Sequence, residues 1–229
     1  MVPSNSRNAQ IKLSLGLLLT CVAVLGIILV RIKMQRDVVE NRAKYNLQSW
    51  IAHGMKGYSE FQGNGRMIPQ AICDKDGKPL LSWRVALLPY IEETSRFGQF
   101  ALDEPWDSPH NIKMLAAMPS KYESPRKNGK PGETFYQVFT GPGTAFPKSG
   151  QGKLPRFSDC ADQLLVVEAL NGVPWTKPDD LPYDAQKPLP PLGGVFGEGK
   201  FFGVFGDQSV RWFSSPSERQ LRECITGRK

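Results

Sequence analysis

The chain has 229 residues, and its 29 lysines and arginines outnumber its 22 aspartates and glutamates, which gives a net charge of +7. The excess positive charge lies before Tyr45, where seven basic residues are opposed only by Asp37 and Glu40. A basic cluster beside an apolar segment is better explained by anionic lipid headgroups than by nucleic acid, so the pattern excludes nucleic acid as a partner. The residues after Tyr45 suffice for one domain with a sizeable core.

An unbroken run of apolar and small residues at positions 13–30 is the clearest feature near the N-terminus. A hydrocarbon core of roughly 30 Å requires about 20 helical residues, and residues 11–32 supply that length with charges only near the ends. No small-x-small cleavage site precedes Arg31, so we expect an uncleaved, single-pass anchor at 11–32 after an N-terminal tail at 1–10. The lipid bilayer is therefore an expected partner.

The charges beside this span do not agree with an extracytoplasmic domain. Five basic residues follow the apolar run and two precede it, and the positive-inside rule taken literally would keep the C-terminal domain in the cytoplasm.

Cys73, Cys160 and Cys224 lie outside the span without C-x-x-C spacing, so we expect neither a zinc site nor a full disulfide set. At most one intramolecular disulfide is possible among these three cysteines.

Apolar residues recur at helical spacing after the span, which predicts that the helix continues through residues 33–62 as the spine of the domain. They are Leu47, Trp50, Ile51, Gly54, Met55, Tyr58 and Phe61. The sequence Gly63-Asn64-Gly65 ends the helix, because consecutive turn formers have low helix propensity. Residues 63–229 then form an α+β domain.

Short helices and turns are predicted in the first half of this domain. Residues 74–77 (DKDG) form a tight turn and not a calcium loop, because Val85 stands where the closing glutamate would be. Ser82 caps a short helix that runs to Ile91, and Ser108-Pro109 begins a second helix that runs to Pro119.

Short β-rich segments divided by glycine and proline follow, which predicts an antiparallel sheet. The expected strands are residues 134–140, 163–168, 200–205 and 209–213, with a hairpin turn at 206–208. Residues 171–199 are rich in proline and glycine and are expected to form a long loop. Ser215 caps a final helix, with Pro216 in its first turn and Glu218 as the capping-box residue, and Gly227 ends this helix.

The sequence contains no nucleophile elbow, dinucleotide-binding, phosphate-binding or zinc-protease motif, so we expect no catalytic residue. Residues 141–149 approach a phosphate-binding loop, but Pro142 and Pro147 replace its two glycines, which favours a turn.

The richest polar cluster lies at residues 102–111, where three carboxylates, the His110 imidazole and the Asn111 amide are close in sequence. Its part 103–110 is referred to below as the 103–110 turn. Its carboxylates and His110 suit a hard cation such as Ca²⁺, or an acid-base pair in a hydrolase. Alternatively, Asp107 and Ser108 cap the next helix while Trp106 fills the core. The metal-ligand candidates are Asp103, Glu104, Asp107 and the more distant Asp207, and no other cofactor is expected.

Aromatic and acidic residues alternate within the long loop, at Trp175, Asp179, Asp180 and Tyr183. They either form a surface for a partner or fold back so that the loop covers its own aromatic residues. Together with Trp106 and His110, they are the candidate interaction residues.

Five segments carry a resemblance to a known family: residues 80–85 (LLSWRV), 102–111, 136–144 (YQVFTGPGT), 173–183 and 205–211 (FGDQSVR). They resemble a bacterial family of pilin-like proteins of unknown function with a prepilin-type H-x9-DG signature. The segment 103–107 is also similar to an Asp-Pro-Trp turn of the major pseudopilins of type II secretion. The resemblance implies a long N-terminal helix, half in the membrane and half packed on an antiparallel sheet, with the domain outside the cytoplasmic membrane.

Two departures from the family pattern bear on function. Residues 10–15 lack the glutamate of the family's processing site, which argues against processing and entry into a filament. In the H-x9-DG signature, Gly197 occupies the histidine position and Gln208 replaces the final glycine, so only Asp207 is kept.

Two functional hypotheses result. The first is a non-enzymatic, membrane-anchored pilin-like protein that contacts other pilin-like or envelope proteins. The second is a calcium- or ligand-binding extracytoplasmic domain, or a weak hydrolase, that uses the 103–110 turn.

Overall fold

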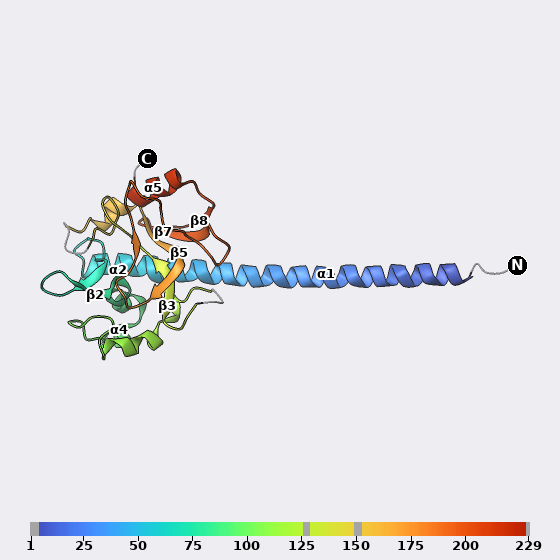
Figure 1. Ribbon diagram of the computed structural model, residues 1–229, viewed down its shortest axis with the longest axis horizontal. Helices are drawn as coiled ribbons and strands as arrows, with labels where there is room; N and C mark the ends of the chain where they lie inside the picture. Colours follow the sequence, from blue (N-terminus) through green and yellow to red (C-terminus); the bar gives the residue numbers. More distant parts are fainter. Residues whose placement is uncertain (1–4, 126–128, 149–152, 228–229) are drawn as a thin grey trace. The chain divides into compact units, whose positions relative to one another are not determined.

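The computed structural model describes residues 5–125, 129–148 and 153–227, with side chains from residue 17 onward. The chain forms two compact units, Met1–Arg42 and Ala43–Lys229. A long N-terminal helix is followed by antiparallel strands, short helices and loops, so the fold class is α+β as the sequence predicts (Figure 1).

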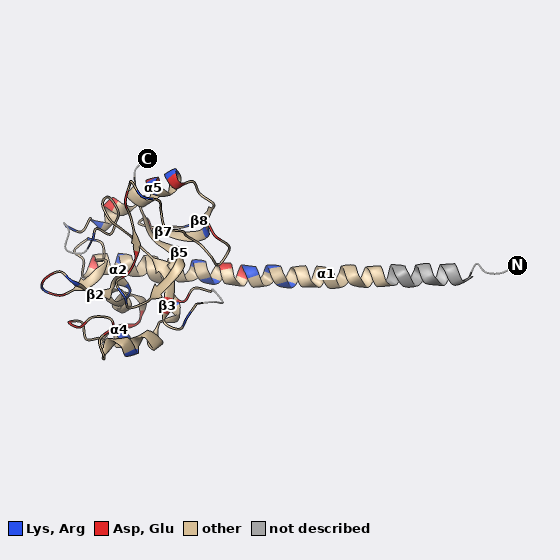
Figure 2. Ribbon diagram, viewed as in Figure 1, with Lys and Arg blue, Asp and Glu red and all other residues tan. Residues whose placement is uncertain are grey.

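The first unit is helical. Helix α1 (Asn5–Tyr45) begins inside the segment expected to be a tail, and residues 1–4 of that segment lie outside the described residues. Every residue from 17 to 32 is exposed, and the helix from Leu17 onward is long and apolar enough to cross a membrane. Basic residues follow the uncharged stretch on the same helix (Figure 2).

The predicted spine helix is present in the second unit, but it contains a π-helical segment that the sequence did not predict. The π-helix η1 (Asn46–Ala52) follows α1 and leads into α2 (His53–Phe61). Leu47, Ile51 and Met55 are buried, as their helical spacing requires. Asn46 is also buried, and its side-chain amide donates to Ser120 O at 3.3 Å and to Glu123 O at 3.5 Å.

The main sheet contains four antiparallel strands in the order β3-β5-β7-β8. These strands are β3 (Glu133–Gln137), β5 (Leu164–Pro174), β7 (Lys200–Phe205) and β8 (Val210–Ser214). Two further strand pairs complete the unit: β1 (Ala71–Cys73) antiparallel to β2 (Pro79–Ser82), and β4 (Phe139–Thr140) parallel to β6 (Leu181–Pro182). The predicted β7–β8 hairpin is confirmed, with Phe202 opposite Trp212.

Two strand predictions need correction. The strand expected at 134–140 divides after Gln137, because β3 pairs with β5 whereas β4 pairs with β6. The loop expected at 171–199 is in part strand, since β5 extends to Pro174 and β6 lies within it. Asn171 and Gly172 are weak strand formers, but pairing of the following residues with Glu133 and Thr134 keeps the segment extended.

Both faces of the main sheet are covered, which explains why its central strands are apolar along their length. On one face, Phe202 and Val204 of β7 belong to the core that contains the spine helix. On the other face, Phe201 and Phe205 belong to a second core that contains Ile225 of helix α5 (Glu218–Thr226). Alternate residues of a strand point to opposite faces, so one strand contributes to both cores.

Short helices connect these elements. They are α3 (Trp83–Ala86), η2 (Leu88–Ile91), α4 (Thr94–Phe97), η3 (Asn111–Ala117), η4 (Ser120–Tyr122) and η5 (Phe157–Cys160). The cap predicted at Ser82 is confirmed, since Ser82 Oγ accepts from Arg84 N at 3.2 Å. The cap predicted at Ser215 is wrong: Ser217 and Gln220 form a reciprocal capping box, so α5 begins at Glu218. The helix predicted after Ser108 is the 3₁₀-helix η3.

Candidate functional site

The 103–110 turn is organised by the side chain of Asn111, which is fully buried. The Asn111 amide accepts from Ala101 N at 3.0 Å and donates to the carbonyls of Ala101, Glu104 and Pro105 at 2.9–3.1 Å. Ser108 Oγ accepts from Asn111 N at 3.0 Å. The turn is therefore held by backbone carbonyls around one amide, an arrangement that satisfies a buried polar group. Sequence reasoning counted Asn111 in the cluster without assigning it this role.

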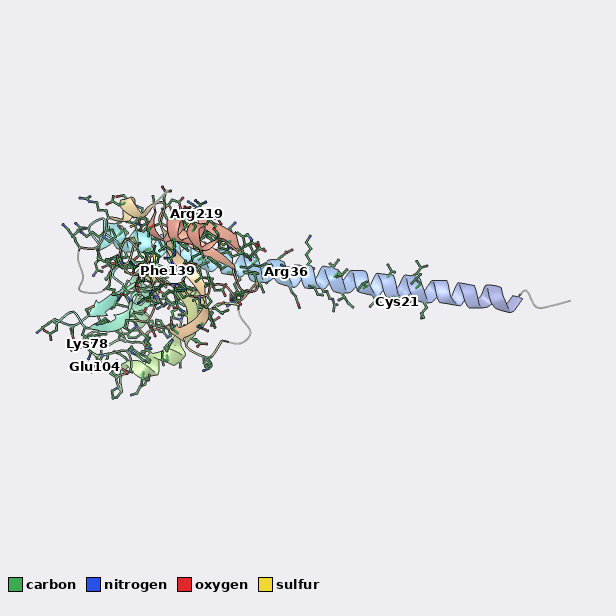
Figure 3. The ribbon with its side chains drawn as sticks, turned by 45° about the horizontal axis from the view of Figure 1, so that its top comes forward. Cys21, Arg36, Lys78, Glu104, Phe139 and Arg219 are labelled. Carbon is green, nitrogen blue, oxygen red and sulfur yellow. The ribbon has the colours of Figure 1, made fainter. Side chains whose placement is uncertain are left out.

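The carboxylates of this turn point outward and do not converge. Asp103 and Asp107 are exposed and Glu104 is half-buried, and Figure 3 shows Glu104 at the periphery of the unit. In the part of the chain that the structure describes, no three His, Cys, Asp or Glu side chains are close enough to hold a metal ion. The geometry of Asp103, Glu104, Asp107 and Asp207 thus gives the calcium hypothesis no support.

The other two residues of the turn have structural contacts. Trp106 is half-buried against the main core, and its backbone N donates to Leu80 O at 2.9 Å. The Lys177 ammonium lies 5.8 Å from the centre of the Trp106 ring. His110 is exposed, with Nε2 at 2.8 Å from Gln99 O. These contacts fit the hypothesis that the turn is a rigid structural element.

A buried ion pair fixes the segment that follows β5. Arg84 Nη2 donates to Asp180 Oδ1 at 2.8 Å, and both side chains are fully buried. Asp180 Oδ1 also accepts from Val138 N at 3.0 Å and from Trp83 Nε1 at 3.2 Å. Arg84 donates in addition to Tyr136 O, at 3.0 Å from Nε and 2.7 Å from Nη2. The pair thereby joins α3, the segment between β3 and β4, and the long loop.

Burial raises the pKa of Asp180, while the Arg84 guanidinium and the Val138 amide act in the opposite direction. A buried carboxylate is tolerated only when it is paired and hydrogen-bonded, and Arg84 meets this requirement. Sequence reasoning did not single out Arg84. The position of Arg84 inside a run of apolar residues, between Trp83 and Val85, could have indicated that its side chain is buried.

The interaction residues proposed for the long loop differ in accessibility. Trp175 is fully buried, donates from Nε1 to Met114 O at 3.2 Å, and packs edge-to-face on Phe100. The side chain of Asp180 is equally buried and Tyr183 is 8% exposed, so these residues cannot form a partner surface in the folded unit. Asp179 is exposed and paired with Lys177 at 2.8 Å. The loop thus folds back over its own aromatic residues.

Asp207 occupies the turn of the β7–β8 hairpin. Burial raises the pKa of Asp207, but hydrogen bonds from Ser209 and the Arg211 guanidinium outweigh it and hold the pKa below its usual value. Asp207 Oδ2 lies 2.7 Å from Arg211 Nη2. The next residue, Gln208, has a φ of +66°, a left-handed conformation that glycine adopts at less cost.

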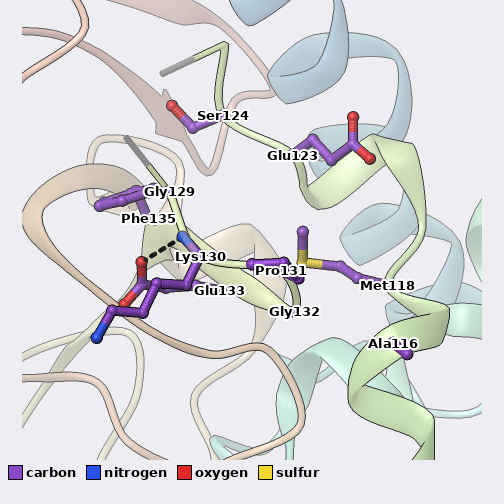
Figure 4. Close-up of a pocket in the computed structure, with 10 residues that line it drawn as sticks. All are labelled: Ala116, Met118, Glu123, Ser124, Gly129, Lys130, Pro131, Gly132, Glu133 and Phe135. Carbon is purple, nitrogen blue, oxygen red and sulfur yellow. Dashed lines mark hydrogen bonds between the residues drawn. The ribbon is translucent and has the colours of Figure 1, made fainter. Parts of the chain in front are cut away.

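A pocket of about 360 Å³ lies between the segment after η3 and strand β3 (Figure 4). Glu123, Ser124, Lys130, Glu133 and Phe135 contribute to its lining, and Glu133 Oε2 accepts from Lys130 N at 3.1 Å. None of the residues proposed from the sequence lines this pocket.

All four cysteines are free thiols. Burial, aided by the charge of Asp159, raises the pKa of Cys160 to about 11, and burial also raises the pKa of Cys224. A thiol with a raised pKa is a poor nucleophile at neutral pH, so neither residue has the character of a reactive cysteine.

Comparison with known proteins identifies the family. No curated protein and no solved structure matches the chain. Residues 51–183 match a family described as a protein of unknown function, DUF1559. This match covers the last part of the spine helix, the 103–110 turn, the Arg84–Asp180 pair and Tyr183, which is more than half of the sequence. The chain therefore belongs to the DUF1559 family.

Proposed function

We propose that the protein is a non-enzymatic, single-pass protein of the inner membrane, whose second unit is a pilin-like domain on the exoplasmic side. There it takes part in envelope assembly or acts as an interaction module. The observation that carries this proposal is the apolar helix, in which every residue from 17 to 32 is exposed on all sides. A helix that is apolar all round requires an apolar environment, and a lipid bilayer supplies one.

The pilin-like part of the proposal is supported by the architecture of the second unit. Its spine helix packs on one face of an antiparallel sheet, which is the arrangement that the resemblance implies. Residues 10–15 lack the glutamate of a prepilin processing site, which favours a permanent anchor over a filament subunit. Their side chains lie outside the described residues.

Anchoring can be tested by extraction of membranes with alkaline carbonate. We expect the wild-type protein to stay in the pellet, and Val24→Arg to move to the supernatant or to be lost, because an arginine at the centre of a span costs about 2.5–3.5 kcal/mol. Val38→Arg makes the same change at an exposed position of the same helix beyond the span, and is expected to behave as wild type. A soluble mature protein that begins after residue 32 would show a cleaved signal sequence and contradict the anchor.

The orientation can be tested by protease treatment of intact spheroplasts. Digestion of the second unit, with a cytoplasmic marker protected, is the expected result. Full protection until the membrane is permeabilised would place the unit in the cytoplasm, in line with the basic residues after the span.

The second hypothesis can be separated from the first by calcium titration and by hydrolase assays on the full chain. Binding of Ca²⁺ to the native state would raise Tm as the ion concentration rises. We expect no rise at millimolar Ca²⁺ beyond that seen with Mg²⁺. Turnover of esters, glycans or phosphate esters that Asp103→Asn and Asp107→Asn abolish would refute the non-enzymatic proposal.

A further inference from the structure

Two arginines stand directly opposite each other in a short antiparallel pairing outside the main sheet. Arg66 follows the spine helix and pairs with Arg156, which precedes η5. Hydrogen bonds of 2.8 and 3.0 Å join the residues on either side of this pair. The arginines are therefore a non-hydrogen-bonded pair, in which opposed Cα atoms are about 4.5 Å apart and side chains are closest.

Neither guanidinium is neutralised by a carboxylate. Among the residues whose side chains the structure describes (17–125, 129–148 and 153–227), Arg66 and Arg156 form no ion pair. The remaining residues of the sequence include no Asp or Glu that could pair with them. Arg66 Nη1 donates to Leu154 O at 2.7 Å, and Arg156 is exposed. Like charges directly opposite on paired strands destabilise a fold, so folding does not explain this pair.

Further positive charge lies beside the two arginines. The Lys56 ammonium is 5.8 Å from the ring centre of Phe157, the neighbour of Arg156, and Lys153 is exposed three residues before Arg156. Two acids lie nearby: Glu60 pairs with Lys56 at 2.7 Å, and Asp159 accepts from Ser158 Oγ at 3.2 Å and keeps its negative charge. The four basic side chains outnumber these two carboxylates, so the local charge favours an anion.

We propose that Arg66 and Arg156 form a binding site for a tetrahedral oxyanion, a phosphate or sulfate group that is either free or carried by a lipid headgroup. A guanidinium presents parallel N–H donors whose spacing matches two oxygens of such a group. An oxyanion between the two arginines removes their repulsion and uses donors that the fold leaves open. Lys153 adds charge at the edge of this site.

The test is thermal unfolding of the full chain in a neutral detergent, with sodium phosphate exchanged for sodium chloride at constant ionic strength. We expect phosphate to raise Tm by about 2–4 °C at saturation, and Arg156→Gln to abolish this rise. In chloride alone, Arg156→Gln should unfold at the wild-type Tm or above it, because the repulsion is gone. A merely structural arginine would instead lower Tm in both salts.

Two matched variants separate the site from general charge effects. Arg219→Gln removes one exposed charge on α5 and should keep the full phosphate response, whereas Arg156→Lys should keep a weakened one. The same measurement in nanodiscs with and without phosphatidylglycerol identifies the source of the group. A rise with phosphate or with the anionic lipid that depends on Arg156 supports the site. No rise with either, or equal rises in wild type and Arg156→Gln, overturns it.

Discussion

At the scale of the residue, the Arg84–Asp180 pair has the largest expected effect on stability. Asp180→Asn leaves a buried guanidinium without its counter-charge, and the loss of one partner of a buried pair costs about 3–5 kcal/mol. Asp179→Asn removes the neighbouring carboxylate, whose pair with Lys177 is half-exposed and contributes at most about 0.5–1 kcal/mol. Urea unfolding of both variants measures the difference, and equal effects would contradict a structural role for the buried pair.

The backbone of Gln208 allows a prediction of the opposite sign. A left-handed conformation costs a non-glycine residue about 1–2 kcal/mol, and part of this is regained when glycine takes its place. Gln208→Gly should therefore raise the free energy of unfolding by about 0.5–1 kcal/mol. Gln186→Gly, at an exposed loop position outside the left-handed region, should lower it, and thermal unfolding measures both.

Residue roles were only partly predictable from the sequence. Ser82 was recognised as a cap because a cap depends on the few residues that follow it, whereas the cap of α5 is Ser217 and not the predicted Ser215. The burial of Trp175 and Asp180 depends on Arg84 and Met114, which lie far away in the sequence. Local pattern cannot show which of several aromatic and acidic residues finds such a partner.

At the scale of the element, close packing of the spine helix on η2 makes two of its glycines unequal. A Cβ at Gly54 would lie 2.6 Å from Ile91 Cγ2, whereas a Cβ at Gly57 would lie 3.6 Å from the nearest atom of Tyr90. Gly54→Ala should therefore destabilise the unit by about 1–3 kcal/mol through overpacking. Gly57→Ala should stabilise it by about 0.5–1 kcal/mol through helix propensity.

Urea unfolding of the two alanine variants measures these effects, with helix content followed by circular dichroism. Stabilisation of both variants would show that propensity, and not the approach of Gly54 to Ile91, decides the outcome, and destabilisation of both would contradict the expected gain at Gly57.

Elements with a strong local pattern were predicted, and elements defined by long-range pairing were not. The β7–β8 hairpin and α5 carry turn and cap signals within a few residues. Strand β6 is two residues long and exists because it pairs with β4, about 40 residues earlier. The π-helix η1 has no sequence signature of its own, and it coincides with a buried Asn46 that donates to distant carbonyls.

At the scale of the whole molecule, the thiols report on opening of the fold. Cys160 is 1% exposed with a pKa of about 11, whereas Cys73 is half-buried. An alkylating reagent attacks the thiolate, so in the native protein Cys73 should react at least about 100-fold faster than Cys160. Peptide mass spectrometry measures both rates, and the two thiols should react alike in denaturant. Comparable native rates would contradict the burial of Cys160.

The coverage of the sheet on both faces has a consequence for how the chain is made. Strands β3, β5 and β7 are complete once residue 205 has been synthesised, yet the core around Phe201 and Phe205 is completed only by Ile225 of α5. Chains emerge from the N-terminal end, and apolar surface exposed in the meantime is prone to aggregation. A chain that ends before Ile225 should therefore expose apolar surface on this face of the sheet.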